Sequence, residues 1–179
     1  ILSYQLITDV TGVEISLNTR ESLAAKGVDV YADIDNIPIS RMFGVIRMNW
    51  SLEHVHSPKR YFQYIKNHLE EEGQAVIAVP NYEGLLYKLA PDCVELPIHL
   101  YHFRPSDIEN YSHKFGLKIH SLTTFSCVGT FNFASQLGML PEAFNKQFGL
   151  REARNFQTVL NYFDCAGWGN DMVAVLKHE

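Results

Sequence analysis

The stretch Phe43–Pro58, FGVIRMNWSLEHVHSP, decides the fold of this chain. Its first part, Phe43–Met48, is a short apolar run with a β-branched centre, which predicts a buried parallel strand. Its second part, Asn49–Pro58, is polar, carries His and Glu side chains and stops at a proline, which predicts a loop at the carboxyl end of that strand. Because open α/β sheets bind ligands at the carboxyl ends of their strands, we expect functional residues in this loop.

The next segment continues the same alternation of strand and helix. Helical spacing of apolar residues predicts a helix over Pro58–Glu71, with the proline in its first turn and Gly73 ending it. The run GQAVIAVPN, Gly73–Asn81, then predicts a strand over Ala75–Val79. A strand, a helix and a second strand in this order form a βαβ unit, which implies a mostly parallel sheet.

The rest of the chain extends this pattern on both sides. Further strands are expected at Asp9–Ile15, Val28–Tyr31, Leu117–Phe125 and Met172–Lys177, and further helices from Ser16 or Asn18 to Ala25, over Asp107–Phe115 and over Leu150–Phe163. The segment Cys127–Gln147 is rich in Phe, Gly and Met, and its periodicity is weak. We predict one α/β domain over residues 1–179, with the last strand antiparallel and inserted beside Ala75–Val79.

Composition narrows the function classes. A chain of 179 residues is long enough to bury a substantial core. Its formal net charge of −5 argues against a broad nucleic-acid-binding surface. No apolar run approaches the ~20 residues of a membrane span, so no membrane association is expected. The three cysteines are widely spaced and match no zinc or redox pair, which fits a reducing compartment, so we expect a cytoplasmic protein.

The order of these motifs resembles that of class I S-adenosylmethionine-dependent methyltransferases. The resemblance rests on SLEHV at Ser51–Val55, on the strand that ends in Pro80-Asn81 and on the loop His99–Phe103, HLYHF. It continues through Phe115-Gly116-Leu117 and the Gly-rich turn before the last strand. It implies a Rossmann-like fold, S-adenosylmethionine as cofactor and a small-molecule or sugar-containing acceptor. A homodimer is one quaternary structure that it allows.

The resemblance also has two departures. In this family the first strand is followed by a glycine-rich loop that binds the cofactor. Nothing before Ile1 supplies that strand or that loop here. We therefore expect an N-terminally truncated domain that, as given, binds the cofactor weakly. The second departure is Gly44, which stands where the family usually has Asp.

The resemblance assigns cofactor-binding roles to residues at three strand ends. Glu14, followed by Ile15, would accept hydrogen bonds from the ribose hydroxyls, and Asp33 with the backbone N–H of Ile34 would contact the adenine. Asn49 and Trp50 would meet the cofactor after the next strand. From the residues alone, Glu14 could equally be a solvated acid, Asp33 a turn residue that caps its own backbone and Trp50 an edge residue of the core.

Two histidines are the candidate catalytic residues. His54 is expected at the methionine end of the cofactor or at the acceptor, and His99 in the loop that covers the acceptor pocket. A neutral imidazole can take a proton from an acceptor hydroxyl, although methyl transfer depends mainly on alignment. A metal site at Glu53, His54 and His56 is not expected, because zinc sites usually use three or four ligands and no further cluster lies nearby.

Two other functions stay open on the sequence. An NAD-dependent oxidoreductase or epimerase would use Glu14 in the same way, but the chain lacks a Tyr-x-x-x-Lys pair. A degenerate, non-catalytic methyltransferase-like domain that binds a partner is the other alternative, which Gly44 favours.

Overall fold

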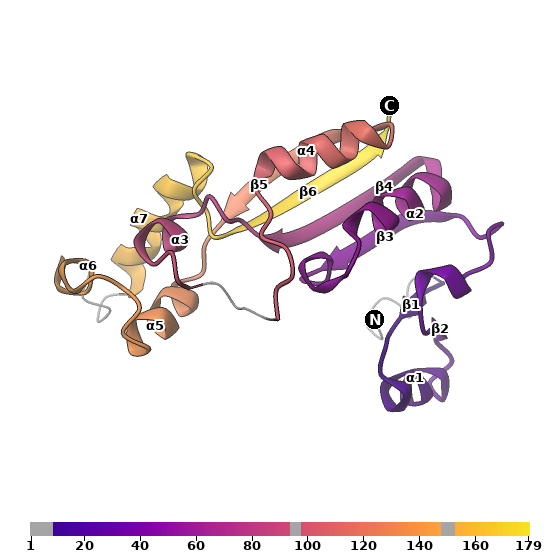
Figure 1. The fold of residues 1–179 in the computed structure, drawn as a ribbon, viewed down its shortest axis with the longest axis horizontal. Helices are drawn as coiled ribbons and strands as arrows, with labels where there is room; N and C mark the ends of the chain where they lie inside the picture. Colours follow the sequence, from indigo (N-terminus) through magenta and orange to yellow (C-terminus); the bar gives the residue numbers. More distant parts are fainter. Residues whose placement is uncertain (1–8, 94–97, 148–152) are drawn as a thin grey trace. The chain divides into compact units, whose positions relative to one another are not determined.

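The computed structural model describes residues 9–93, 98–147 and 153–179 (Figure 1). The chain divides into two compact units, with the boundary between Met42 and Phe43. None of the helices in the described ranges combines the length and the apolar character that crossing a membrane requires.

The first unit is a small βαβ arrangement. Strand β1, Thr11–Val13, pairs in parallel with strand β2, Asp29–Tyr31, and helix α1, Leu17–Ala24, connects them. The 3₁₀ turn η1, Ile34–Asn36, follows β2. The expected elements are therefore present, although β1 is shorter than the predicted Asp9–Ile15.

Local chemistry explains where α1 begins and ends. The Ser16 hydroxyl accepts a hydrogen bond from the Thr19 N–H at 3.4 Å, as an N-cap side chain does. Gly27, at a φ of 79°, turns the chain after the helix in the left-handed region that glycine adopts without strain. Both signals agree with the sequence-based prediction.

The second unit is built on a four-stranded sheet in the order β3-β4-β6-β5. The strands are β3, Phe43–Asn49; β4, Leu69–Pro80; β5, Leu117–Phe125; and β6, Asp171–His178. Strand β3 is parallel to β4, whereas β6 is antiparallel to both of its neighbours. The last strand thus lies beside β4 and runs in the opposite direction, which confirms the prediction for Met172–Lys177.

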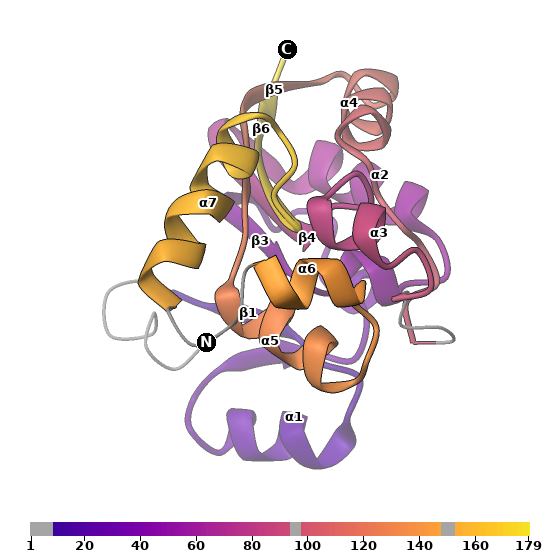
Figure 2. The same cartoon turned by 90° about the vertical axis from the view of Figure 1, so that its left-hand side faces the viewer.

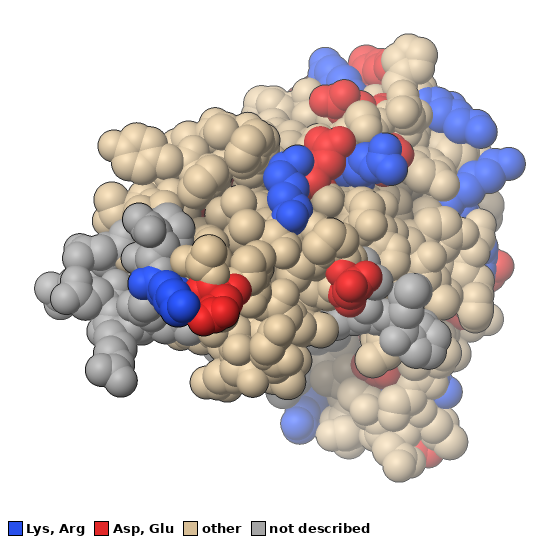
Figure 3. Space-filling model, turned by 60° about the vertical axis from the view of Figure 1, so that its left-hand side comes forward, with Lys and Arg blue, Asp and Glu red and all other residues tan. Residues whose placement is uncertain are grey.

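Helices cover both faces of this sheet, as expected (Figure 2). Helices α2, Pro58–His68, and α4, Pro105–Lys114, lie on one face, and α7, Ala153–Cys165, lies on the other. Three shorter helices lie near the end of the sheet: α3, Leu85–Leu89; α5, Val128–Gln136; and α6, Glu142–Gln147. On the face that Figure 3 shows, acidic and basic side chains are interspersed, with broad uncharged areas between them.

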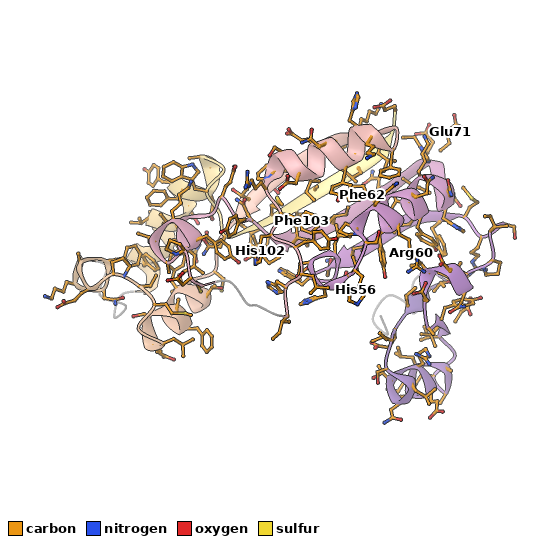
Figure 4. The ribbon with its side chains drawn as sticks, in the orientation of Figure 1. His56, Arg60, Phe62, Glu71, His102 and Phe103 are labelled. Carbon is orange, nitrogen blue, oxygen red and sulfur yellow. The ribbon has the colours of Figure 1, made fainter. Side chains whose placement is uncertain are left out.

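The main core lies between the sheet and the helices α2 and α4. Phe62 and Ile65 of α2 and Ile108 of α4 are buried against alternate residues of β4 and β6. Phe62 lies beneath its helix and Phe103 enters the same layer from the loop before α4 (Figure 4). A second cluster joins α3, α5 and α7, where the Phe131 ring meets the Phe156 ring edge-on at 5.3 Å.

The structure corrects three details of the sequence prediction. Helix α2 ends at His68, and Gly73 lies inside β4, where a Cβ atom would come within 2.9 Å of the Glu70 carbonyl oxygen. Strand β4 starts early because Leu69 is buried in the core and pairs with Phe43, before an irregularity in the register. Strand β3 is not buried as predicted: Val45 is 64% exposed, and β3 is one of the two edge strands of the described four-stranded sheet.

A tight polar junction closes the end of β4. The buried Asn81 donates hydrogen bonds to the carbonyl oxygens of Gly167 and Gly169 at 3.2 and 2.8 Å. Its own side-chain oxygen accepts from the Glu83 N–H at 3.1 Å. Asn170, next to Gly169, in turn accepts from the Leu86 N–H at 2.9 Å. These bonds fix the turn before β6 against the end of β4.

Candidate functional site

Trp50 occupies the end of β3 in a conformation that is rare for its residue type. Its φ is 43°, and its N–H still donates to the Ala78 carbonyl oxygen at 2.8 Å, so the turn begins where the pairing with β4 ends. The indole Nε1–H donates to Asp171 Oδ1 at 3.3 Å, at the start of β6. The indole therefore lies across the end of β4 and remains 48% exposed. Left-handed strain in a bulky residue persists where surrounding structure enforces it, and such residues concentrate at functional sites.

Asp171, the partner of this indole, is an unusual carboxyl group. Its burial raises its pKa above the ordinary value of 3.8; the hydrogen bond from Trp50 lowers that pKa, and the nearby Asp164 carboxylate raises it. Because the folded state disfavours the ionised form, the stabilising contribution of protonated Asp171 is complete below pH 3.8. That contribution is lost as the pH rises through the raised pKa of the folded state.

We expect Asp171→Asn to gain stability relative to the unsubstituted chain as the pH rises above 3.8. The amide keeps an oxygen for the Trp50 N–H but carries no charge to bury. Melting temperatures measured across pH would show the difference growing with pH. Trp50→Phe, which removes the hydrogen bond that lowers the pKa of Asp171, should make the fall in stability steeper. A difference that shrinks as the pH rises would contradict this account.

The preceding residue, Asn49, uses its side chain within the strand. Its Oδ1 accepts a hydrogen bond from Arg47 Nε at 2.9 Å. The two side chains lie on the same face of β3, because residues two apart in a strand project to the same side. The Asn49 side chain is thus anchored to Arg47 through its oxygen, and its Nδ2 amide group and its backbone can serve the predicted contact with a ligand.

Two segments far apart in the sequence form a cluster of one carboxylate and two imidazoles, Glu53, His54 and His99. Their potential ligand atoms all lie within 4.8 Å of one another. His54 Nε2 lies 3.8 Å from Glu53 Oε1, and the His54 and His99 rings meet edge-on with centroids 4.8 Å apart. Glu53 is 1% exposed and His99 8%, whereas the His54 side chain is 39% exposed, so the cluster has two buried members and one that reaches the surface.

Backbone hydrogen bonds hold the two segments of this cluster together. The Glu53 carbonyl oxygen, in the 3₁₀ turn η2, Leu52–His54, accepts from the N–H groups of Leu100 and Tyr101 at 2.8 and 3.2 Å. His54 Nδ1 lies 3.0 Å from the Ile98 carbonyl oxygen, which favours the tautomer with the proton on Nδ1. Nε2 of His54 then keeps a lone pair on the side of Glu53.

Aromatic residues border the cluster on one side. His102 lies 6.5 Å from His99 between ring centroids, and Tyr82 lies 5.2 Å from His102 and 5.4 Å from Tyr87. His102 Nε2 is buried without a hydrogen-bond partner among the described residues. Rings with a polar edge arranged in this way can hold a flat or sugar-like molecule by stacking and by hydrogen bonds.

The other predicted site residues belong to the first unit. Glu14 follows β1, where its N–H donates to the Tyr31 carbonyl oxygen and its Oε1 accepts from the Ser16 N–H at 2.8 Å. Asp33 follows β2, and its Oδ1 accepts from the Asp35 N–H at 2.9 Å. Because β1 and β2 are parallel neighbours, both carboxylates lie at one edge of the pair. The side chain of Ile15 is exposed and that of Ile34 is buried, so each could serve a ligand through its backbone.

These carboxylates fit the adenosine part of the expected cofactor. Both are fixed by short hydrogen bonds to their own backbone, which orients them at the strand ends. The bond to Asp33 is the turn-capping role that the sequence left open for it. A carboxylate has about four lone-pair sites, so one backbone bond does not exhaust its capacity to accept.

The sequence grouped Glu53 with His54 and His56, whereas the structure groups Glu53 with His54 and His99. The side chain of His56, labelled in Figure 4, is exposed, and His56 is not among the clustered residues. Local spacing holds no signal for His99 as a neighbour of Glu53, because loop-to-loop hydrogen bonds create that contact. Asn81 was noted as part of a motif, but its role in bridging β4 to the turn before β6 could be seen only in the fold.

Comparison with known proteins gives a consistent result. The model of a family described as methyltransferase domain matches residues 1–122. None of the curated proteins compared with the chain matches it.

Solved structures share the fold at low sequence identity. A possible histamine N-methyltransferase from Thermotoga maritima is 16% identical with a TM-score of 0.60, over 94% of this chain and 72% of that one. An S-adenosylmethionine-dependent methyltransferase from Clostridium acetobutylicum is 15% identical with a TM-score of 0.55, over 96% and 75%. One from Mesorhizobium loti is 14% identical with a TM-score of 0.57, over 94% and 80%. The predicted Rossmann-like fold is thereby confirmed.

Proposed function

This chain belongs to the methyltransferase domain family, and from that premise we propose that it transfers a methyl group from S-adenosylmethionine to a small-molecule acceptor. The observation that carries the proposal is the extent of the family match. It covers residues 1–122 and so includes every candidate residue of the site, from Glu14 to His99. The cofactor supplies a methyl group on a sulfonium, and the chain supplies binding and alignment.

Glu14 and Asp33 are proposed to hold the adenosine part of the cofactor. The Glu14 carboxylate accepts hydrogen bonds from the two ribose hydroxyls, which is how dinucleotide-binding folds use an acid after a strand. Asp33 accepts from the adenine amino group, while the Ile34 N–H donates to the ring. Trp50 presents an exposed aromatic face, which attracts a cation by ~0.5–2 kcal/mol and so suits the sulfonium.

His54 and His99 are proposed to act on the acceptor. Methyl transfer is an in-line displacement, so the nucleophilic atom must be held in line with the methyl group and lose its proton. The lone pair on His54 Nε2 and the enclosed His99 ring are placed to draw that proton from a hydroxyl group. An oxygen nucleophile is therefore the proposed acceptor atom.

The enclosure of the cluster supports a small acceptor. Glu53, His99 and the His102 Nε2 atom are buried, and the bordering rings of Tyr82 and Tyr87 offer flat faces. Such a site suits a planar or sugar-containing molecule better than an extended polymer, and the net charge of −5 agrees.

Cofactor binding by the chain with its upstream residues restored is the direct test, and Glu14→Ala is the informative variant. Losing hydrogen bonds to a charged group costs ~1.5–3 kcal/mol, so the dissociation constant for S-adenosylmethionine should rise about ten-fold or more. Calorimetric titration measures it, and Glu21→Ala, on the exposed face of α1, is the matched control. Saturable binding of NAD in place of S-adenosylmethionine would favour an oxidoreductase. Absence of binding by either ligand would favour a non-catalytic domain.

A further inference from the structure

We propose that Glu53, His54 and His99 together bind a divalent transition-metal ion such as Zn²⁺. The three residues offer one carboxylate oxygen and two imidazole nitrogens, and these atoms lie within 4.8 Å of one another. Two imidazoles and one carboxylate are a recurring ligand set for zinc and for ferrous iron, and they leave a position open for a further ligand. Mg²⁺ and Ca²⁺ prefer oxygen ligands and suit this set less well.

The distances are close to those of a loaded site. Ligand atoms that bind one zinc ion at about 2.1 Å in tetrahedral geometry lie roughly 3.4 Å apart, and the centroids of two such imidazoles lie roughly 5 Å apart. His54 Nε2 and Glu53 Oε1 are separated by 3.8 Å, and the two ring centroids by 4.8 Å. The His54–Glu53 pair is thus close to a loaded geometry, and the three ligand atoms, which lie within 4.8 Å of one another, would have to draw closer to bind one ion.

The surroundings of the cluster support metal binding. Metal-binding histidines commonly donate their second ring N–H to a carbonyl oxygen, which fixes the tautomer. His54 Nδ1 is placed in this way, 3.0 Å from the Ile98 carbonyl oxygen. The hydrogen bonds from Leu100 and Tyr101 to the Glu53 carbonyl oxygen lock the loop that carries His99 against η2. The three ligands are thus held by backbone contacts and not by flexible side chains alone.

Charge gives a further reason. Glu53 is 1% exposed, and burying a carboxylate is costly unless a cation or strong hydrogen bonds compensate it. A divalent ion between Glu53 and the two imidazoles would add a favourable charge interaction to this buried carboxylate. The catalytic use of the metal, which rests on the proposed function, would be to bind the acceptor oxygen and ease loss of its proton to water. In the metal-loaded site His54 and His99 would act as ligands, and the metal would take over the role proposed above for their free nitrogens. Metal binding itself does not depend on that function.

The experiment titrates the chain with metal after chelator treatment. Cys127 and Cys165 are exposed thiols, so both are replaced by serine in every sample to remove thiol binding. Zn²⁺ affinity is measured by competition with a chromophoric chelator, and Co²⁺ is added as a spectroscopic probe of nitrogen and oxygen ligands. We expect one equivalent of Zn²⁺ to bind with a dissociation constant of about 1 μM or lower.

Three ligand variants and one control decide the outcome. Glu53→Gln, His54→Gln and His99→Gln should each weaken Zn²⁺ binding at least about 100-fold, the upper end of what losing a supporting partner costs. His56→Gln makes the same chemical change at an exposed position two residues from His54 and should bind like the parent. Thermal melts show whether each variant is folded, and Zn²⁺ should raise the melting temperature only where the site is intact.

Two results would overturn the proposal. One is no saturable Zn²⁺ or Co²⁺ binding by the parent chain at about 100 μM metal. The other is equal binding by the parent and the three ligand variants. S-adenosylmethionine titrations of the same samples separate this proposal from the proposed function. Cofactor binding without metal binding would end only the metal site, and metal binding without cofactor binding would count only against the proposed methyl transfer, not against the metal site.

Discussion

Gly169→Ala should destabilise the second unit by about 3 kcal/mol or more, which is at the severe end for a single substitution. A Cβ atom at this position would lie 2.3 Å from the backbone nitrogen of Phe125 and 2.7 Å from the backbone carbon of Thr124. Both obstacles are backbone atoms of β5, so a side-chain rotation cannot relieve them. The turn before β6 would have to move, which would break the hydrogen bonds that Asn81 makes to it.

Thermal unfolding measures this effect, and we expect the melting temperature to fall by about 10 °C. Gly129→Ala is the matched control, because its Cβ atom would meet only the Cys127 sulfur at 3.4 Å. That glycine lies in helix α5, so alanine should be neutral there or stabilise by about 0.5–1 kcal/mol. Equal melting temperatures for the two variants would mean that the close approach of this turn to β5 is wrong.

His54→Gln and His99→Gln should each lower the rate of methyl transfer about 10²–10⁴-fold, the usual range for losing a positioned proton acceptor. Glutamine is polar and similar in length but cannot take a proton. The loss should appear in kcat more than in KM, because the imidazoles act on the proton that leaves during the transfer. Formation of the demethylated cofactor measures the rate, with an acceptor found by screening phenols, sugars and amines.

His56→Gln is the control for this pair as well. Its side chain is exposed, and its backbone carbonyl oxygen accepts a hydrogen bond from the Tyr101 hydroxyl at 3.1 Å. The variant should keep the full rate. Unchanged rates in the His54 and His99 variants would show that alignment alone drives the transfer, and loss of activity in His56→Gln would point to general damage to the loop.

Part of this structure could be read directly from local patterns. Strand β5 was predicted at Leu117–Phe125 and lies there, because alternating apolar and polar residues specify a strand without reference to its neighbours. The start of α2 at Pro58 and the end of α1 before Gly27 followed from single residues with strong backbone preferences. The short helices α5 and α6 show little periodicity of apolar residues in the sequence, because few of their residues are buried in the second cluster.

By itself, the sequence determined the order of the main strands and helices, because apolar periodicity and turn residues are patterns of neighbouring residues, and the order of the motifs indicated the family and the antiparallel last strand. Only the tertiary structure decided that β3 lies at the edge of the described four-stranded sheet and that Gly73 lies inside β4. It also decided that His99 joins Glu53 and His54, while His56 stays outside. The physical reason is that amide hydrogen bonds from Leu100 and Tyr101 to the Glu53 carbonyl oxygen create this contact. Backbone groups are the same in every residue, so no pattern of side chains records which distant segments they will join.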